Sequence, residues 1–583
     1  MQRLKVLRSL LYTVCFLLTS SLTATPQQPV PASPDENRAG TISGTVVNES
    51  GQPLIGAIVS VRPAGPPVVG RTAVTDTEGS FRIAGLDNGI YYVSASSPAY
   101  VSPPFDIQNP LPTYRVGDTV RLELIRGGVI TGTLTNSAGD PMVGIRVRAS
   151  MVRYASGKAM IGGVFSVNEK TTDDRGIYRL YGLTPGTYLV MAGGGGPQSL
   201  ITSTDLDAPT FAPSSTRDTA AEIQVRGGEE VTADIRYRAE PGHSISGTVK
   251  TQGTTGASVS LMRVGDDMVP SNGSYQTPGS RGFTIYGLAD GEYDLIAQEA
   301  ISSIGAALPD LAMSDPFRVT IRGSDVNGVE LVPKPLASIS GKVVLEPSRL
   351  PDCQNRRQPL FSETVIALVE NPKDAHIDQS TLLRSMLGAV TADKDGSFTL
   401  KNIRHGQYAF VPRFFGRYWY LRSMTMSSPA AQSPAKQSTS IRDVTKNWTP
   451  VKSGDRLTGL IITLTEGAAS IRGQLTIAEG AKLESGMRVY LVPAERDKTD
   501  DPLRYFTQEI AGDGAFALSG VQPGRYLILA EQSRADFPPS TEKLRLPDAV
   551  DARLKIRSAA ELEKTELELK PCQSLTEYKL KAQ

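Results

Sequence analysis

Seven residues, written GLxxGxY, recur along this chain and constrain its fold more than any other feature. The copies read GLDNGIY from Gly85, GLTPGTY from Gly182, GLADGEY from Gly287, NIRHGQY from Asn402 and GVQPGRY from Gly520. Each copy follows an apolar opening that contains a glycine two residues on, and these openings start at Ile42, Ile130, Ile245, Ile339 and Ile471. The openings lie roughly one hundred residues apart, the size of one small β-sandwich. The sequence therefore predicts an all-β chain of five tandem β-sandwich domains.

The recurring motif is interpreted as a structural turn. Gly89 of the first copy is predicted to take a positive φ where the chain reverses. Tyr91 is predicted to bury its ring and return its hydroxyl to the backbone. No acid, base or metal ligand is constant among the copies, which argues against a ligand role. The predicted turn residues are Gly85, Gly89, Tyr91, Gly182, Gly186, Tyr188, Gly287, Gly291, Tyr293, Gly406, Tyr408, Gly520, Gly524 and Tyr526.

The joints between the predicted domains contain few residues. Each closing strand leads almost directly into the next opening strand, which predicts a semi-rigid rod of domains. In the last domain the closing strand is predicted in KTELELKPC from Lys564. The predicted segments are a signal peptide at 1–24, a linker at 25–39, sandwich domains at 40–126, 127–240 (with a long loop), 241–334, 335–466 (with insertions) and 467–573, and a tail at 574–583.

The first residues of the chain have the pattern of a secretory signal. Arg3, Lys5 and Arg8 give a basic start, and the apolar stretch at 9–22 is too short to span a bilayer as a mature helix. Cleavage is predicted after Ala24, with an uncleaved amphipathic anchor as the alternative. The chain is therefore predicted to be exported, to the periplasm, the cell surface or the medium, with no transmembrane segment in its mature form.

Two cysteines, Cys353 and Cys572, remain after such cleavage. In a secreted chain they either form a disulfide, which would tie the fourth domain to the chain end, or remain two separate buried thiols. Their spacing and the lack of histidine partners exclude a zinc site.

The first two repeats resemble the carboxypeptidase regulatory-like domain. The similar stretches are ISGTVVNESGQPLIGAIVSVRP with TAVTDTEGSFRIAGLDNGIYYVSAS in the first, and VITGTLTNSAGDPMVGIRVRA with TTDDRGIYRLYGLTPGTYLV in the second. This resemblance implies a Greek-key, transthyretin-like β-sandwich, related to the carbohydrate-binding-like fold and the collagen-adhesin B-type domain. It implies no catalytic residue, because the domain accompanies peptidases, receptors and adhesins alike.

The histidines offer no catalytic site. His243, His376 and His405 lack the glutamate three residues on that a zinc carboxypeptidase needs, and a serine triad would require one of them. The formal net charge of +1 gives no general attraction to nucleic acid. The sequence therefore predicts a protein that is not an enzyme, with no cofactor, no bound metal and no nucleic-acid partner. A turn with Asp393 and Asp395 either holds calcium or, as favoured here, is an ordinary hairpin turn.

The densest aromatic stretch, RFFGRYWYLR, begins at Arg413. Read as one strand, it places Phe414, Tyr418 and Tyr420 on one face, and Phe415, Trp419 and Leu421 on the other. Aromatic rings flanked by arginines can stack on sugars or fill a protein groove. The alternative is an ordinary buried strand beneath inserted segments at 352–390 and 424–450. The candidate ligand-binding residues are Arg413, Phe414, Arg417, Tyr418, Trp419 and Tyr420.

These features predict a secreted or cell-surface binding or scaffold protein. Its expected partner is an extracellular or surface protein, or a carbohydrate. One alternative is a carbohydrate-binding protein that uses the aromatic residues of the fourth domain. The other is an accessory protein to an extracellular hydrolase or transporter.

Overall fold

The structure is a computed structural model. It describes residues 40–64, 70–103, 112–155, 158–161, 168–194, 203–250, 256–265, 272–276, 282–299, 310–353, 357–373, 389–427, 441–476, 483–484, 486–533 and 540–581. The described strands form ten sheets, which combine into five successive pairs. We call these pairs units one to five; they contain β1–β8, β9–β18, β19–β27, β28–β36 and β37–β43. The predicted all-β array of tandem β-sandwiches is confirmed. The predicted signal peptide, 1–24, lies outside the described residues.

Unit one shows the plan that the other units follow. Its first sheet has the order β4 (Ser80–Leu86), β1 (Gly40–Asn48), β8 (Thr119–Arg126) and β6 (Tyr100–Val101). Its second sheet has the order β3 (Arg71–Val74), β2 (Ile58–Pro63), β5 (Ile90–Ser96) and β7 (Tyr114–Arg115). The opening strand β1 pairs antiparallel with β4 and parallel with the closing strand β8. Alternate residues of the strands point inward, so both sheets contribute to one core, which includes Ile42, Val59 and Phe81.

Units two and three repeat this plan, each with its own buried core. Unit two has β13 (Ile177–Leu183), β9 (Gly128–Thr135), β17 (Glu230–Thr232) and β18 (Ile235–Arg236) in its first sheet, and β11 (Lys158–Ile161), β10 (Arg146–Ala155), β12 (Asn168–Thr171), β14 (Gly186–Ala192), β15 (Thr210–Phe211) and β16 (Ile223–Val225) in its second. Unit three has β22 (Gly282–Leu288), β19 (His243–Val249) and β26 (Val326–Leu331), and opposite them β21 (Asn272–Gln276), β20 (Ala257–Arg263), β23 (Gly291–Glu299), β24 (Ala312–Met313), β25 (Phe317–Ile321) and β27 (Lys334–Pro335). The short helices here are α2 (Ser203–Leu206) and η1 (Arg217–Thr219).

Units four and five have the same two-sheet plan. Unit four has β31 (Ser397–Ile403), β28 (Ala337–Glu346), β36 (Arg456–Glu466), β33 (Trp419–Ser427) and β34 (Ile441–Asp443), and opposite them β30 (Val390–Thr391), β29 (Thr364–Glu370), β32 (Gly406–Phe414) and β35 (Thr449–Val451). Unit five has β40 (Ala515–Val521), β37 (Ala469–Thr476) and β43 (Ser574–Lys581), and opposite them β39 (Phe506–Glu509), β38 (Met487–Pro493), β41 (Gly524–Gln532) and β42 (Glu566–Leu569). Their helices are η2 (Pro351–Cys353), η3 (Phe361–Glu363), η4 (Arg496–Lys498), η5 (Pro502–Arg504), α4 (Thr541–Leu544) and α5 (Val550–Glu563).

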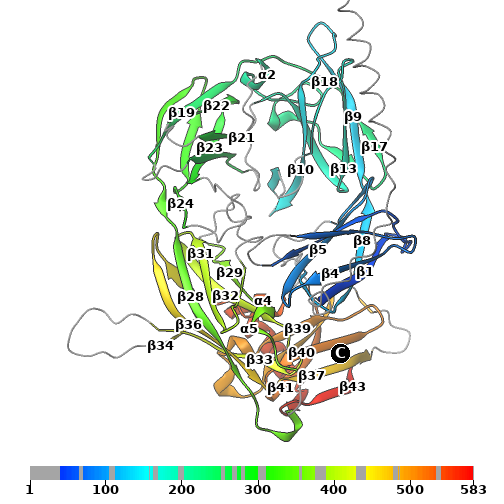
Figure 1. The fold of residues 1–583 in the computed structure, drawn as a ribbon, viewed down its shortest axis with the longest axis vertical. Coiled ribbons are helices and arrows are strands. Elements are labelled where there is room, and N and C mark those ends of the chain that lie inside the picture. Colours follow the sequence, from blue (N-terminus) through cyan, green and yellow to red (C-terminus); the bar gives the residue numbers. More distant parts are fainter. Residues whose placement is uncertain are drawn as a thin grey trace, which may run out of the picture.

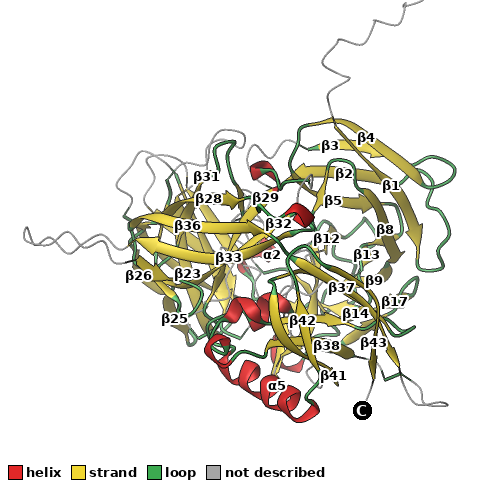
Figure 2. Ribbon diagram, turned by 90° about the horizontal axis from the view of Figure 1, so that it is seen from below, coloured by secondary structure: helices red, strands yellow, loops and turns green. Residues whose placement is uncertain are grey.

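The predicted end of unit five was wrong. The stretch from Lys564 forms β42, which pairs with β41 in the second sheet. The closing strand is β43, which lies in the predicted tail 574–583 and pairs parallel with β37. Helix α5 packs its buried Ile556 and Ala560 on the outer face of the sheet that contains β38 and β41 (Figure 2). None of the helices in the described ranges combines the length and apolar character needed to cross a membrane.

The glycine of each opening strand lies where the parallel closing strand passes very close. A Cβ on Gly341 would lie 2.3 Å from the carbonyl oxygen of Leu460 and 2.7 Å from Cζ of Phe398. The matching glycines of the other units, Gly44, Gly132, Gly247 and Gly473, would meet a closing-strand carbonyl oxygen at 1.8 to 2.4 Å. The opening motif therefore contains glycine because no side chain fits between these two strands.

We expect Gly341→Ala to lower the free energy of unfolding of unit four by about 2 kcal/mol, because the added methyl forces β28 and β36 apart. Trp419 lies in the core of unit four, so denaturant unfolding followed by tryptophan fluorescence reports on this unit. Lys342→Ala is the matched control, since its exposed side chain lies on the same strand. Equal midpoints for the two variants would contradict the expected clash.

The first residue of the recurring turn has a positive φ in every unit, whereas the prediction placed the positive φ of the first copy at Gly89. Gly85 has φ 77° and sits at a bulge of β4 against β1, whereas Gly89 is not among the residues with positive φ. Asn402 takes the same place in unit four with φ 57°, a conformation that asparagine tolerates better than most residues. The bulge therefore has a left-handed residue in every unit, whereas the reversal that follows has a positive φ at its glycine only in units three to five, at Gly291, Gly406 and Gly524.

The tyrosine that ends each turn is buried in every unit. The Tyr91 hydroxyl donates to the carbonyl oxygen of Asp87 at 2.8 Å, and that of Tyr188 donates to Thr184 at 2.6 Å. Tyr293 and Tyr526 make the same bond to the residue four positions earlier. The hydroxyl thus satisfies a turn carbonyl while the ring fills the core.

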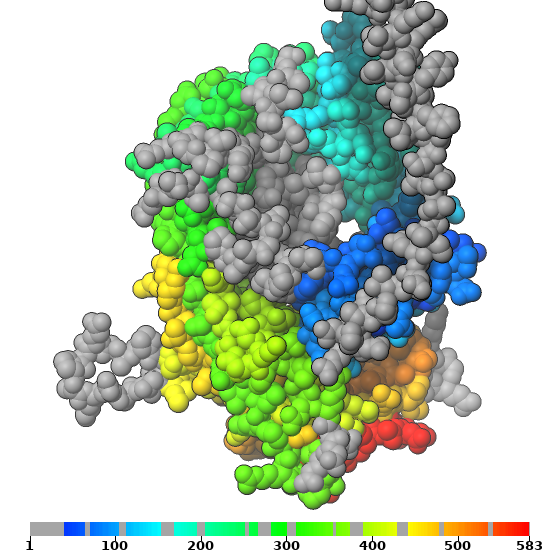
Figure 3. Space-filling view, in the orientation of Figure 1, coloured from blue at the N-terminus to red at the C-terminus, as the bar shows by residue number. Residues whose placement is uncertain are grey.

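The units do not form a rod. In Figure 1 the chain passes from β1 and β5 to β9 and β13, across to β19 and β22, and back through β24 to β28. Ala64 and Ile90 of unit one and Val365 and Ala389 of unit four form one buried apolar cluster, and the space-filling view shows these units in contact (Figure 3). The short joints were expected, but they bend the chain, and the apolar cluster holds its first and fourth units together.

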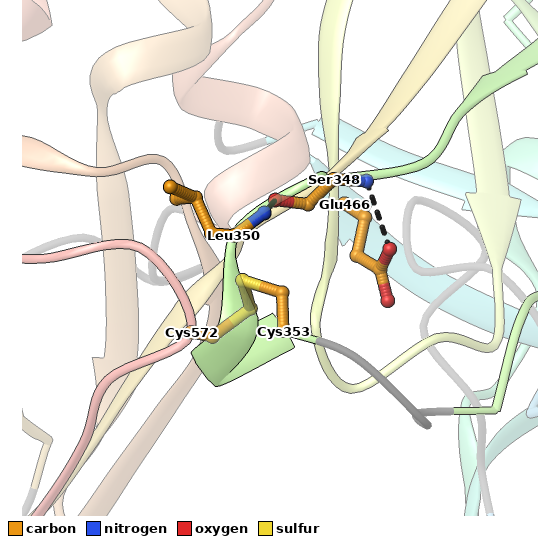
Figure 4. The surroundings of a disulfide bond; sticks show 5 residues. All are labelled: Ser348, Leu350, Cys353, Glu466 and Cys572. Carbon is orange, nitrogen blue, oxygen red and sulfur yellow. Dashed lines mark hydrogen bonds between the residues drawn. A yellow bond between two sulfur atoms is a disulfide. The ribbon is translucent and has the colours of Figure 1, made fainter.

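A disulfide joins units four and five (Figure 4). The sulfur atoms of Cys353, in η2, and Cys572, between β42 and β43, are bonded, and Cys353 is completely buried. Close by, the backbone N–H of Ser348 donates to Oε2 of Glu466 at 2.9 Å, and the N–H of Cys572 donates to the carbonyl oxygen of Gly467 at 3.0 Å. Of the two alternatives for the cysteines, the structure has the disulfide, which fixes the joint between the two units.

Candidate binding cleft

The aromatic stretch from Arg413 is two strands and a turn. β32 ends at Phe414 in one sheet, and β33 begins at Trp419 in the other. The N–H of Trp419 donates to the carbonyl oxygen of Gly416 at 3.0 Å, which closes the turn between them. The predicted single strand with two aromatic faces was therefore wrong, because the chain crosses from sheet to sheet at Gly416.

The candidate ligand-binding residues separate into two groups. Trp419 is 0% exposed and belongs to the core of unit four, so its ring presents no face for a sugar. Tyr418 and Tyr420 are half-buried, and burial raises the pKa of the Tyr420 hydroxyl. Arg413, Phe414, Arg417 and Trp419 contribute to the wall of one cavity, which neither tyrosine lines.

This cavity, of about 810 Å³, is open to solvent and is built from three units. Unit one contributes Arg115 from β7, and unit four contributes the turn between β32 and β33. Unit five contributes β39, β40, the start of β37 and the residues around α4. Such a volume lies within the range of about 300–1,000 Å³ that is usual for ligand sites. The bent path of the chain creates this cavity, since units one and four meet beside unit five.

Arginine dominates the charged side chains of the cavity. We call it the arginine cleft after its six lining arginines, Arg115, Arg413, Arg417, Arg472, Arg488 and Arg545. Among the described residues that line it, Glu542 is the single acidic one. The whole chain has a formal net charge of +1, so this positive charge is a local feature. Clustered cations with low-dielectric walls attract anions strongly.

Packing fixes several of these guanidinium groups. Arg545 donates to the backbone carbonyl oxygens of Tyr505 and Leu503 and lies 4.5 Å from the ring centroid of Phe506. Burial lowers the pKa of Arg545 to about 10, so it remains protonated at neutral pH. Arg115 lies over the ring of Phe415 at 5.3 Å, which joins unit one to the turn of unit four. The cleft therefore presents oriented cations.

The described residues contain no cluster of three or more histidine, cysteine, aspartate or glutamate side chains placed to hold a metal ion. His243 lies 3.4 Å from Asp290, and His405 lies 3.4 Å from Asp315, both as partners of surface carboxylates. His376 falls outside the described residues. Asp395 accepts hydrogen bonds from the N–H and the hydroxyl of Ser397, as in a hairpin turn.

Four arginines of the cleft had no signal in the sequence. Arg115, Arg472, Arg488 and Arg545 come from two units and from separate strands and loops. Only the order of the units around the bent chain brings them together. The aromatic stretch near Arg413 does lie in one wall of the cleft. It lies there as the turn between two sheets, and not as the single strand with aromatic faces that the sequence predicted.

Comparison with known proteins agrees with the fold. Residues 41–117 match the family model of the carboxypeptidase regulatory-like domain, which confirms the resemblance seen in the first repeat. No curated protein matches the chain.

Solved structures match locally. The Bacillus anthracis TIE protein is 15% identical, with a TM-score of 0.14, and the match covers 51% of this chain and 51% of that one. Shaft pilin SpaA from Lactobacillus rhamnosus GG is 10% identical over 34% of this chain and 97% of its own, with a TM-score of 0.16. BcpA, the major pilin subunit of Bacillus cereus, is 12% identical over 51% of this chain and 99% of its own, with a TM-score of 0.13. Likenesses of this strength say nothing about function.

Proposed function

We propose that this chain is an exported, non-enzymatic scaffold that binds a partner in the arginine cleft. One observation carries the proposal: three units that are not all neighbours in sequence converge to line a single charged cavity. Repeated sandwiches supply rigid walls, and the joints, the apolar cluster and the disulfide hold these walls in place. Binding sites are commonly found where domains meet.

The composition of the cleft favours binding over catalysis. The described part of its lining has arginine, aromatic and small residues, with Glu542 as the single carboxylate and no histidine. General acid–base chemistry needs a group that titrates near the working pH, whereas arginine stays protonated. The pattern at 1–24 supports export, and the cell envelope or the surface is then where a partner would be met.

The test is fractionation of cells that express the full chain with an affinity tag. We expect the wild type in the exported fraction and retained on the envelope. A chain without residues 2–24 should stay inside the cell. The double charge reversal Arg417→Glu/Arg472→Glu should be exported equally but lost from the envelope.

The matched control is Arg121→Glu/Arg322→Glu. These arginines are exposed, lie outside the cleft and change the net charge by the same amount. Equal envelope retention of both double variants would contradict a role for the cleft. A wild-type chain that remains in the cytoplasm would contradict the exported scaffold.

A further inference from the structure

The arginines of the arginine cleft outnumber the acidic side chains close to them. Three of its arginines have an acidic neighbour: Arg115 lies 3.2 Å from Asp118, Arg413 lies 3.4 Å from Glu542, and Arg488 lies 3.7 Å from Glu509. Arg417 and Arg472 are exposed and have no ion pair with any residue that the structure describes. Arg545 is held by backbone carbonyl oxygens and an aromatic ring, and it also interacts electrostatically with Glu542 and Asp501. An anion in the cleft would therefore meet cations that are not neutralised.

Two buried donors in the wall lack an acceptor. Trp419 lines the cleft and is completely buried, and its indole N–H has no hydrogen-bond partner among the described residues. The Nε of Arg413 is likewise buried without a hydrogen bond there, and only the ion pair with Glu542 is near. Buried donors are almost always satisfied in folded proteins, and an unsatisfied one costs about 1–3 kcal/mol. Neither atom is exposed, so a ligand in the cleft contacts the accessible arginines and not these two donors.

Guanidinium groups select among anionic ligands. The planar fork of arginine bonds a carboxylate through two parallel N–H donors, which gives both strength and orientation. Phe414, Phe415 and Phe506 lie among these arginines and give the wall an apolar part. The cleft thus suits a ligand that alternates carboxylates with apolar groups.

A strand edge in the wall favours an extended peptide over a sugar or a free anion. Among the described strands, β40 has a neighbour on one side only, namely β37, and its residues Ala517, Leu518, Ser519 and Gly520 line the cleft. At β39, by contrast, the Thr541 hydroxyl already bonds the backbone of Thr507. An added strand would bond the backbone of β40, while its side chains reach the arginines.

We infer that the arginine cleft binds an acidic, extended peptide segment of a partner protein. Its carboxylates contact Arg417, Arg472 and Arg545, and its backbone runs along β40. This inference rests on the proposed function, because it names the ligand of the same cleft.

The probe is a short, blocked and fluorescently labelled peptide in which glutamate alternates with valine. Fluorescence anisotropy with the purified full chain should show saturable binding that weakens as salt is added. The same peptide with glutamine in place of glutamate should bind at least about 100-fold more weakly, because charge-assisted bonds are lost. Replacing the central residues of the peptide by proline should also abolish binding, because proline cannot extend the edge of β40.

Two double variants of the protein test whether the peptide binds in the arginine cleft. Arg417→Glu/Arg472→Glu should weaken binding of the acidic peptide about 100-fold, whereas Arg121→Glu/Arg322→Glu should leave it within about twofold. Unchanged circular dichroism and unchanged tryptophan emission without ligand would show that each variant is folded.

Three outcomes would overturn the inference. Equal binding of the glutamate and glutamine peptides would remove the carboxylate requirement. Binding of an oligogalacturonate, with the same arginine dependence and without peptide binding, would make the occupant a glycan. If neither the glutamate peptide nor the oligogalacturonate binds, the acidic peptide is also rejected as the ligand of the cleft. In each case envelope retention that depends on Arg417 and Arg472 would still support the proposed scaffold, so the two failures are distinguishable.

Discussion

Replacing both cysteines of the Cys353–Cys572 bridge by alanine is expected to lower the free energy of unfolding of unit five by about 4 kcal/mol. Unit five starts at β37, directly after the joint with unit four, and Cys572 immediately precedes its closing strand β43. With the disulfide present, the unfolded chain of this unit is therefore pinned near both of its ends to folded unit four. Removing the bridge releases this restraint and gives the unfolded state much more conformational entropy.

Native-state hydrogen exchange, followed on peptides from β37 and β43, measures this loss. Adding reductant to the wild type should reproduce the effect, while the double alanine variant should not respond to reductant. The opening strand of unit two, β9, serves as the internal reference because it lies outside the bridged joint. Unchanged protection in β37 and β43 would show that noncovalent contacts alone hold the unit.

Trp419→Ala is expected to lower the free energy of unfolding of unit four by about 4 kcal/mol, because the largest buried side chain of its core is removed. Denaturant unfolding followed by circular dichroism measures the change. The matched control is Trp448→Ala. Trp448 is only half-buried, so its loss should lower the free energy by about 1 kcal/mol.

This prediction also separates packing from ligand contact. If the Trp419 ring stacked on a ligand from an exposed position, its removal would reduce binding with little loss of stability. A Trp419→Ala variant as stable as Trp448→Ala would therefore contradict the burial of this ring. A large destabilisation would mean that lost binding in this variant cannot be assigned to stacking.

The repeats predicted the architecture because each copy carries its own local chemistry. Turn residues, alternation and the buried tyrosine act within a few residues of one another, so the pattern is visible in the sequence. The glycine of the opening strand was also visible in the sequence, but the structural reason for a glycine at this position was not. Gly341 is required by the carbonyl oxygen of Leu460, which becomes its neighbour only when the last strand of the unit pairs parallel with the first.

The cleft and the bent path of the chain could not be predicted in the same way. Ile90 and Val365 share one apolar cluster although other units separate them in sequence. In the local sequence each is an ordinary apolar strand residue, and nothing near either one indicates that the two will be in contact. The prediction for the aromatic stretch was wrong for a related reason: local alternation placed Gly416 inside one strand. In the structure Gly416 lies in the turn between two strands of different sheets.

The parallel pairing of opening and closing strands has a mechanical consequence. A force that stretches the chain pulls the start of β1 one way and the end of β8 the opposite way, along their shared direction. The hydrogen bonds between these strands are then loaded together in shear, instead of being opened one after another from an end. Because the opening strand also pairs parallel with a closing strand in units two and three, these units would resist extension in the same way. In the last two units, tension would pass directly from Cys353 to Cys572 through the disulfide, so the segment between these cysteines, which includes β36 and β37, would not be stretched.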